Sequence, residues 1–201
     1  GVALVLAAGV ALAGLATATR DLARAWRDSE SLWTRALAVD PESAFARLSL
    51  GAVRLDEAAR ATDPERRRAL AEEGRQLALS SFDLEPGPEP LVNVALAHGI
   101  LAEVEPRLAP QHREAALRFA EQALVRAQRA DLYEPRYALV FGAHLFNAGR
   151  HAEAEEMFAR YTAERPADPT GWLDLGRARE ARGDRAGARR AYEQCLRRAG
   201  A

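Results

Sequence analysis

Residues 135–168 read PRYALVFGAHLFNAGRHAEAEEMFARYTAERPAD, and residues 169–201 read PTGWLDLGRAREARGDRAGARRAYEQCLRRAGA. The two stretches align at a spacing of 34 residues. The residues that match at this spacing are Pro135/Pro169, Gly142/Gly176, Gly149/Gly183, Ala154/Ala188 and Phe158/Tyr192. Self-similarity at a fixed period is typical of proteins built from stacked units of secondary structure. The sequence therefore predicts a repeat array.

The matched residue types suit two helices that pack as a hairpin. Small residues such as Gly142 and Ala154 are needed where the helix axes approach, and Phe158 fills the gap between layers. Gly149 lies where one helix ends and the chain reverses, a position that favours positive φ. Pro169 suits the first turn of the next helix, where its missing N–H costs no hydrogen bond. A single hairpin of this kind has two apolar faces, so it must stack on neighbours.

These stretches resemble the tetratricopeptide repeat family, whose unit is a helix-turn-helix of this period. In the second stretch the resemblance rests on Trp172, Leu175, Gly176, Gly183, Ala188, Tyr192 and Cys195. The first stretch departs from the family pattern at Ala138, where a large residue is usual, and at Tyr161, where a small one is usual. The resemblance implies an all-α, right-handed α-solenoid.

The repeat template, extended toward the N-terminus, divides residues 20–201 into five units. Pro41 and Pro86 are 45 positions apart, so the second unit carries an insertion relative to the 34-residue period. Its charged run at 66–73 is expected to be a solvated helix face with i,i+4 ion pairs. The units are a partial repeat at 20–41, a repeat with the insertion at 43–86, a degenerate repeat at 88–128, and repeats at 135–168 and 169–201. Helices are expected at 29–41, 43–61, 65–84, 91–103 and 111–128.

Residues 1–19, GVALVLAAGVALAGLATAT, carry no charge. As a helix this run would span roughly 28 Å, close to the hydrocarbon thickness of a bilayer. We favour the end of a transmembrane helix that anchors the repeats to a membrane. Two other interpretations stay open: the apolar region of a signal peptide with an A-x-A site at 16–18, and a buried helix that begins the solenoid.

The segment that follows the apolar run also resembles the junction between membrane domain and repeats in bacterial proteins related to the TMTC-type O-mannosyltransferases. The resemblance rests on Trp26, Glu30, Leu32, Trp33, Ala36, Leu37 and Pro41. It implies that the chain is the C-terminal repeat region of a membrane glycosyltransferase-like protein, whose catalytic site would precede Gly1. The alternative is a membrane-anchored or secreted adaptor with no associated enzyme.

The sequence gives opposing indications about the side of the membrane. Arg20, Arg24 and Arg27 beside the span would place the repeats in the cytoplasm by the positive-inside rule. The junction resemblance implies the extracytoplasmic side, and we favour it because acidic residues are interspersed with these arginines.

Composition and motifs exclude several classes of function. The net charge is −1 with a pI of about 6.5, so no basic field points to nucleic acid. No phosphate-binding loop, nucleophile elbow or dinucleotide-binding glycine pattern occurs. The four histidines, His98, His112, His144 and His151, show no spacing that would bring two together with a carboxylate or cysteine on one helix face. We therefore expect no catalytic residue, cofactor or metal site in this chain.

The family resemblance implies that a peptide or protein binds in a concave groove lined by the first helix of each hairpin. Transferring template positions gives the candidate groove residues Phe45, Leu48, Leu55, Asn93, Arg136, Leu139, Phe146, Asn147, Leu173, Arg177 and Glu180. For each apolar member, simple packing against a neighbouring helix is the alternative. The carboxylate-clamp pattern of the family is absent, because Leu139, Ala143, Leu173 and Arg177 hold its positions, so a chaperone C-terminal peptide is not the expected ligand.

Overall fold

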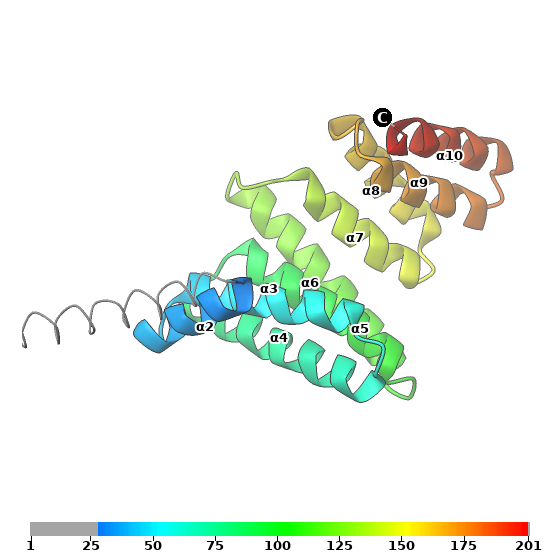
Figure 1. Cartoon of the computed structure of the whole chain (residues 1–201). Coiled ribbons are helices and arrows are strands. Elements are labelled where there is room, and N and C mark those ends of the chain that lie inside the picture. Colours follow the sequence, from blue (N-terminus) through cyan, green and yellow to red (C-terminus); the bar gives the residue numbers. More distant parts are fainter. Residues whose placement is uncertain (1–27, 201) are drawn as a thin grey trace, which may run out of the picture.

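The computed structural model describes residues 28–200, and this part of the chain contains nine α-helices and no strand (Figure 1). The helices are α2 (Ser29–Val39), α3 (Ala44–Arg60), α4 (Pro64–Leu84), α5 (Pro88–Val104), α6 (Ala109–Arg129), α7 (Pro135–Asn147), α8 (His151–Glu164), α9 (Pro169–Ala181) and α10 (Arg185–Ala199). The predicted all-α fold is confirmed for these residues. The apolar run at 1–19, the three arginines after it and Trp26 lie outside the described residues. Between residues 28 and 200 no helix is both long and apolar enough to cross a bilayer.

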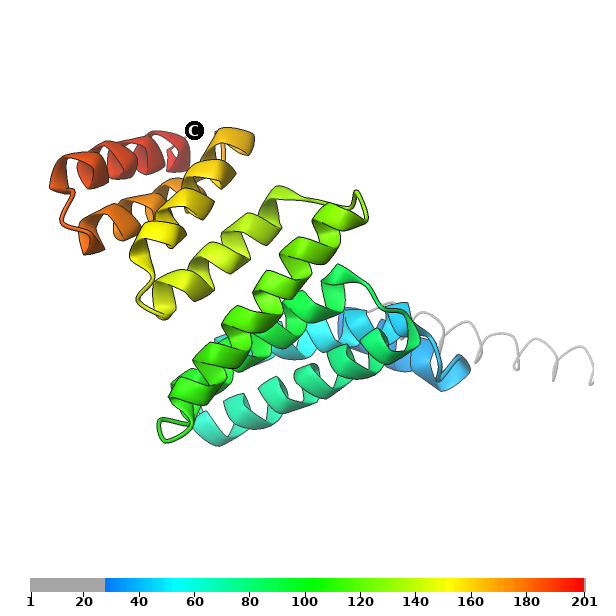
Figure 2. The ribbon, with the colours of Figure 1, turned by 180° about the vertical axis from the view of Figure 1, so that it is seen from behind.

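Consecutive helices pair as hairpins, and the hairpins stack into an elongated array (Figure 1). The pairs are α3/α4, α5/α6, α7/α8 and α9/α10, with α2 packed on α3. Each first helix also touches the next one, because α3 contacts α5, α5 contacts α7 and α7 contacts α9. Figure 2 shows the array from behind, with α6 in front of α5. The first helices therefore share one side of the array, which we call the inner face, and α6 belongs to the opposite side.

Proline, aspartate and glycine set the helix ends as the sequence predicts. Pro169 occupies the first turn of α9, and the side chain of Asp168 caps that helix by accepting from the Thr170 N–H at 2.8 Å. Gly149 and Gly183 have φ of 77° and 82°, which confirms the predicted left-handed turns.

Three helices start earlier than expected: α4 by one residue, α6 by two and α5 by three. Helix α5 begins at Pro88 rather than at residue 91, so the Pro-Gly-Pro segment is only partly a turn. Pro88 and Pro90 both fit the first turn, because the N–H groups of that turn have no partner within the helix.

The two helices of a hairpin approach each other most closely at small residues. A Cβ added at Gly142 would lie 2.8 Å from Cε1 of Phe158, and one at Gly176 would lie 2.4 Å from Cε1 of Tyr192. These are the glycine and aromatic positions that the 34-residue alignment singles out. In the α5/α6 hairpin alanines take over this role, and Ala116, Ala120 and Ala123 are all buried as predicted.

Ion pairs link helices more than the sequence suggests. The expected i,i+4 pairs within the charged run of α4 are not its main contacts: Arg67 pairs with Glu103 of α5, and Arg68 pairs with Glu105 just after it. The run therefore joins the inserted helix to the next hairpin. The reason is the length of α4, 21 residues, which carries its N-terminal turns alongside the C-terminal end of α5.

Arg54 of α3 joins three helices near the start of the array. Its guanidinium contacts Glu30 of α2 at 2.8 Å, Glu57 of its own helix at 3.1 Å and Glu73 of α4 at 2.9 Å. Helix α2 has no buried residue. Its position on α3 therefore depends on this ion-pair network and on the edge-to-face contact between Trp33 and Phe45, whose ring centroids are 5.3 Å apart.

Candidate functional site

Large apolar side chains are exposed on the inner face. Phe45 of α3 is 65% exposed, Leu96 of α5 39% and Leu173 of α9 41%. Most other exposed large apolar residues lie at helix ends or in loops; the exception inside a helix is Leu196, on the terminal helix α10. Leu96 and Leu173 lie within their helices, whereas Phe45 is the second residue of α3. An exposed apolar side chain gains little from folding, so its occurrence on three first helices marks this face as a candidate contact surface.

Phe45 and Leu48 of α3 lie at the N-terminal end of the array. Together with Glu89 and Pro90 of α5 they line a hollow of about 190 Å³. Asn93, one turn further along α5, donates from Nδ2 to the Leu48 carbonyl at 3.4 Å. Asn93 therefore links two first helices and leaves less of its side chain free for a ligand.

Leu55 does not line the inner face. It is buried, and a Cβ added at Gly74 of α4 would lie 2.8 Å from its Cγ and Cδ2. The residue fills the interior of the α3/α4 hairpin, because the glycine of α4 lets the two helices approach closely. Leu55 is thus a core residue, and its expected place in the groove is wrong.

Arg136 connects α7 to α5 across the inner face. Its guanidinium pairs with Glu89, and the same carboxylate accepts from the hydroxyl of Tyr137. Burial raises the pKa of Tyr137, so its hydroxyl stays a hydrogen-bond donor at neutral pH. Leu139 is half-buried against the core formed around Leu145. These contacts make the middle of the inner face more rigid and less apolar than its ends.

The C-terminal part of the inner face is partly polar. Phe146 is half-buried, and its ring centroid lies 4.9 Å from that of His151. In α9, Arg177 is exposed and lies 3.5 Å from Asp174, whose pKa is raised by burial. Glu180 accepts a hydrogen bond from Tyr192 at 2.8 Å. Helix α9 therefore carries exposed Leu173 as well as the charged side chains of Arg177 and Glu180.

A small polar hollow between α5, α6 and α7 escaped the sequence analysis, although Asn147 was among its candidates. The hollow measures about 150 Å³ and is lined by Gly99, Glu103, Arg113, His144 and Asn147, with two alanines. His144 is buried, and its Nε2 has no hydrogen-bond partner among the described residues. Burial lowers the pKa of His144 to about 4, so the ring is neutral at pH 7. Its lining comes from three helices far apart in sequence, which no local pattern reveals.

His98 and His112, for which the sequence analysis found no shared helix face, are in contact across a hairpin. His98 Nδ1 lies 2.9 Å from His112 Nδ1, and His112 Nε2 lies 2.8 Å from Glu105 Oε2. Burial and then the charge of His112 lower the pKa of His98 to about 4. The hydrogen bonds from His112 and Arg68 lower the pKa of the Glu105 carboxyl. The sequence analysis considered single helix faces only and did not anticipate this pair, because His98 and His112 face each other across the α5/α6 hairpin.

This histidine pair forms no metal centre within residues 28–200, where no group of three or more His, Cys, Asp or Glu residues is arranged to hold an ion. The shared contact leaves room for one proton between the two Nδ1 atoms. One of these two atoms therefore donates to the other, while Nε2 of His112 is hydrogen-bonded to Glu105.

The fold is shared with solved structures of low sequence identity. The crystal structure of MamA is 16% identical, covers 84% of this chain and 85% of its own, and has a TM-score of 0.61. A second MamA structure gives 16% identity, coverage of 83% and 78%, and a TM-score of 0.59. The structure of YrrB, described as a TPR protein with an unusual peptide-binding site, is 17% identical, covers 92% and 81%, and has a TM-score of 0.57. No protein-family model and no curated protein matches this sequence. The chain thus has the fold of tetratricopeptide repeat proteins.

Proposed function

We propose that this chain is a non-catalytic scaffold that binds an extended segment of another protein along its inner face. The observation that carries the proposal is the exposure of Phe45, Leu96 and Leu173 on three of the four first helices. Solvent-exposed apolar side chains on a face of this kind are covered when a partner binds. The fold supports the proposal, since YrrB, which shares it, is described as having a peptide-binding site.

Two hollows, one between α3, α4 and α5 and the other between α5, α6 and α7, suggest what the ligand carries. The hollow beside Phe45 and Leu48 suits an apolar side chain. The hollow beside His144 suits a polar one, because the unpartnered imidazole nitrogen and the Asn147 amide can both form hydrogen bonds there. We therefore expect a peptide with an apolar anchor at one end and an amide, hydroxyl or carboxyl side chain further along.

Peptide selection tests this function directly. Peptides enriched from a random displayed library on the 201-residue chain are measured against the variants Leu96→Asp and Leu173→Asp. We expect at least a tenfold loss of affinity in each, because a carboxylate replaces buried apolar contact. Leu196→Asp is the matched control, an exposed leucine on α10. Equal binding to all three variants, or no enrichment over scrambled peptides, would refute the proposal.

We further propose that the parent protein is a membrane glycosyltransferase-like enzyme, with these repeats on the extracytoplasmic side and residues 1–19 as the end of a span. The uncharged run and the junction residues from Trp26 to Pro41 support this. The alternative is a membrane-anchored or secreted adaptor with no enzyme attached. Several hydrophobic spans before Gly1, with an acidic residue in the first non-cytoplasmic loop, would favour the enzyme. A reporter fused after Ala201 tests the side, and a cytoplasmic signal would remove the glycosyltransferase assignment.

A further inference from the structure

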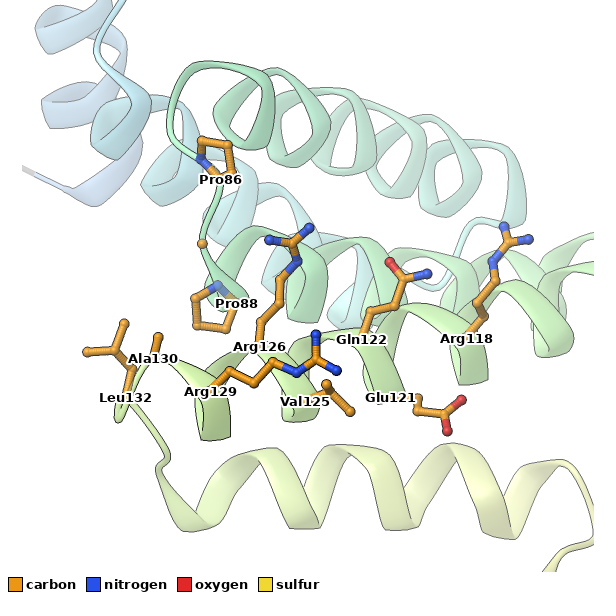
Figure 3. Close-up of a pocket in the computed structure, with 11 residues that line it drawn as sticks. Pro86, Pro88, Arg118, Glu121, Gln122, Val125, Arg126, Arg129, Ala130 and Leu132 are labelled. Atoms are coloured by element: carbon orange, nitrogen blue, oxygen red, sulfur yellow. The ribbon is translucent and has the colours of Figure 1, made fainter.

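A cleft of about 660 Å³ lies away from the inner face, between α6 and the connection from α4 to α5 (Figure 3). Pro86 and Pro88 form one side of it, and α6 forms the other. Arg118 and Arg126 project from α6 in the same direction, toward the side where α4 and α5 lie, as Figure 3 shows. None of these residues belongs to the candidate groove set.

The arginines of the cleft have no carboxylate or hydrogen-bond partner within the described part of the chain. Arg118, Arg126 and Arg129 form no ion pair there and donate no hydrogen bond to a protein acceptor, whereas Arg54, for example, contacts three carboxylates. Glu121 is the single carboxylate among the lining residues. Like charges three or four residues apart on a helix repel each other. The cleft lining therefore carries net positive charge, with three guanidinium groups and one carboxylate.

Two of the guanidinium groups are held in place by aromatic rings. Arg126 lies 5.0 Å from the centroid of Phe82 in α4, and Arg118 lies 5.2 Å from that of Phe119. Such cation–π contacts leave the N–H edge of a guanidinium free to bind a carboxylate. Binding a partner would then cost less side-chain entropy than ordering two free arginines.

The end of the cleft that carries Arg126 and Arg129 also has apolar side chains. Leu132, which follows α6, is 56% exposed beside Pro88. Nucleic acid fits this arrangement poorly, because no aromatic side chain lines the cleft to stack on bases and the whole chain has a net charge of −1. An acidic polypeptide with an apolar residue matches both the arginines and the apolar side chains.

We propose that this cleft is a second binding site, which takes an acidic extended segment of a partner protein. Its carboxylates bind Arg118 at one end and Arg126 with Arg129 at the other, and an apolar side chain packs against Pro88 and Leu132. Arg118 and Arg126 are eight residues apart, so their Cα atoms are separated by about 12 Å along the helix. An extended chain covers that distance in about four residues. The segment therefore has an apolar residue, an adjacent acidic residue, and a second acidic residue about four positions further on.

Fluorescence anisotropy of a labelled peptide tests the site. The probe is an eight-residue peptide with one leucine, an acidic pair after it, and a third acidic residue four positions on. Its matched partner has every Asp and Glu replaced by Asn and Gln. We expect the acidic peptide to bind the full chain, and the double variant Arg126→Gln/Arg129→Gln to bind it at least tenfold more weakly. The neutral peptide should not bind.

The control removes the same number of charges elsewhere. Arg190 and Arg197 are exposed on α10 and form no ion pair among the described residues, and the variant Arg190→Gln/Arg197→Gln should bind as the unaltered chain does. Leu96→Asp should also leave this binding unchanged, which separates the site from the inner face. Equal loss in the control variant, equal binding of the neutral peptide, absence of binding, or tighter binding of a single-stranded oligonucleotide would each overturn the proposal.

Discussion

Substitution of Gly142 by alanine tests the hairpin packing on which the repeat depends. The new Cβ would lie 2.8 Å from Phe158 Cε1 and 3.0 Å from Cδ1. Phe158 is 2% exposed, so its ring has no room to move away. Overpacking of this kind costs about 1–3 kcal/mol, while alanine gains about 1 kcal/mol of helix propensity over glycine. The gain offsets only part of the larger penalties, and we expect a net loss of up to about 2 kcal/mol.

A double-mutant cycle identifies the cause of that loss. In the background Phe158→Leu the ring atoms are gone, so Gly142→Ala should be neutral to within about 0.5 kcal/mol, because helix propensity then offsets the remaining contact with Met157. Urea unfolding followed by circular dichroism gives the free energies, and each kcal/mol corresponds to about 2–4 °C in the melting temperature. An equal loss in both backgrounds would refute the assignment of Phe158 as the partner of Gly142.

Three further outcomes are expected. Acidification from pH 7.5 to pH 5 should lower the free energy of unfolding by on the order of 1–2 kcal/mol for each of His98 and His144. Burial lowers both pKa values to about 4, whereas the pKa of an unfolded histidine is near 6.5. The unfolded state therefore binds more protons between these values, and the stability contribution is fully present only above the unfolded pKa. Urea titrations at the two pH values measure this, and a rise in stability on acidification would contradict it. Arg54→Met should increase amide hydrogen exchange in residues 29–39 more than in the other helices, because it removes the ion pair that holds α2; uniform exchange would show that α2 is held otherwise. Gly183→Ala should destabilise the chain by about 1 kcal/mol through left-handed backbone strain alone, since no atom lies within 4 Å of the added Cβ. Gly183→Asn should destabilise it less, because asparagine tolerates this conformation better. Equal melting temperatures for the alanine variant and the unaltered chain would argue against the strain.

The inner face shows how far the candidate site could be anticipated. Phe45 and Leu173 follow from the repeat template, because exposure on a first helix depends mainly on position within the unit. Leu55 obeys the same template yet is buried, because Gly74, on a helix lengthened by the insertion, admits a leucine between α3 and α4. The repeat template assumes the same helix packing in every unit, so it does not predict the burial of Leu55.

Side-chain contacts between different helices were beyond the sequence analysis. Arg68 was expected to pair within its own helix, but it pairs with Glu105. His98 and His112 are fourteen positions apart and meet only because the α5/α6 turn brings them opposite each other. In both cases the partner depends on how two helices are aligned in space, which residue spacing along one helix does not specify.

The sequence by itself determined the helical hairpins, their turns and their closest approaches. Periodic glycine, alanine, aromatic and proline residues act over distances of a few residues, and left-handed turns at Gly149 and Gly183 are local consequences of residue type. Only the tertiary structure decided which surfaces stay open and charged. The cleft with Arg118, Arg126 and Arg129 exists because α6 lies beside the Pro86–Pro88 connection without a carboxylate opposite each arginine. Whether a carboxylate lies opposite an arginine of α6 depends on which segment packs beside that helix, so it is known only from the folded chain.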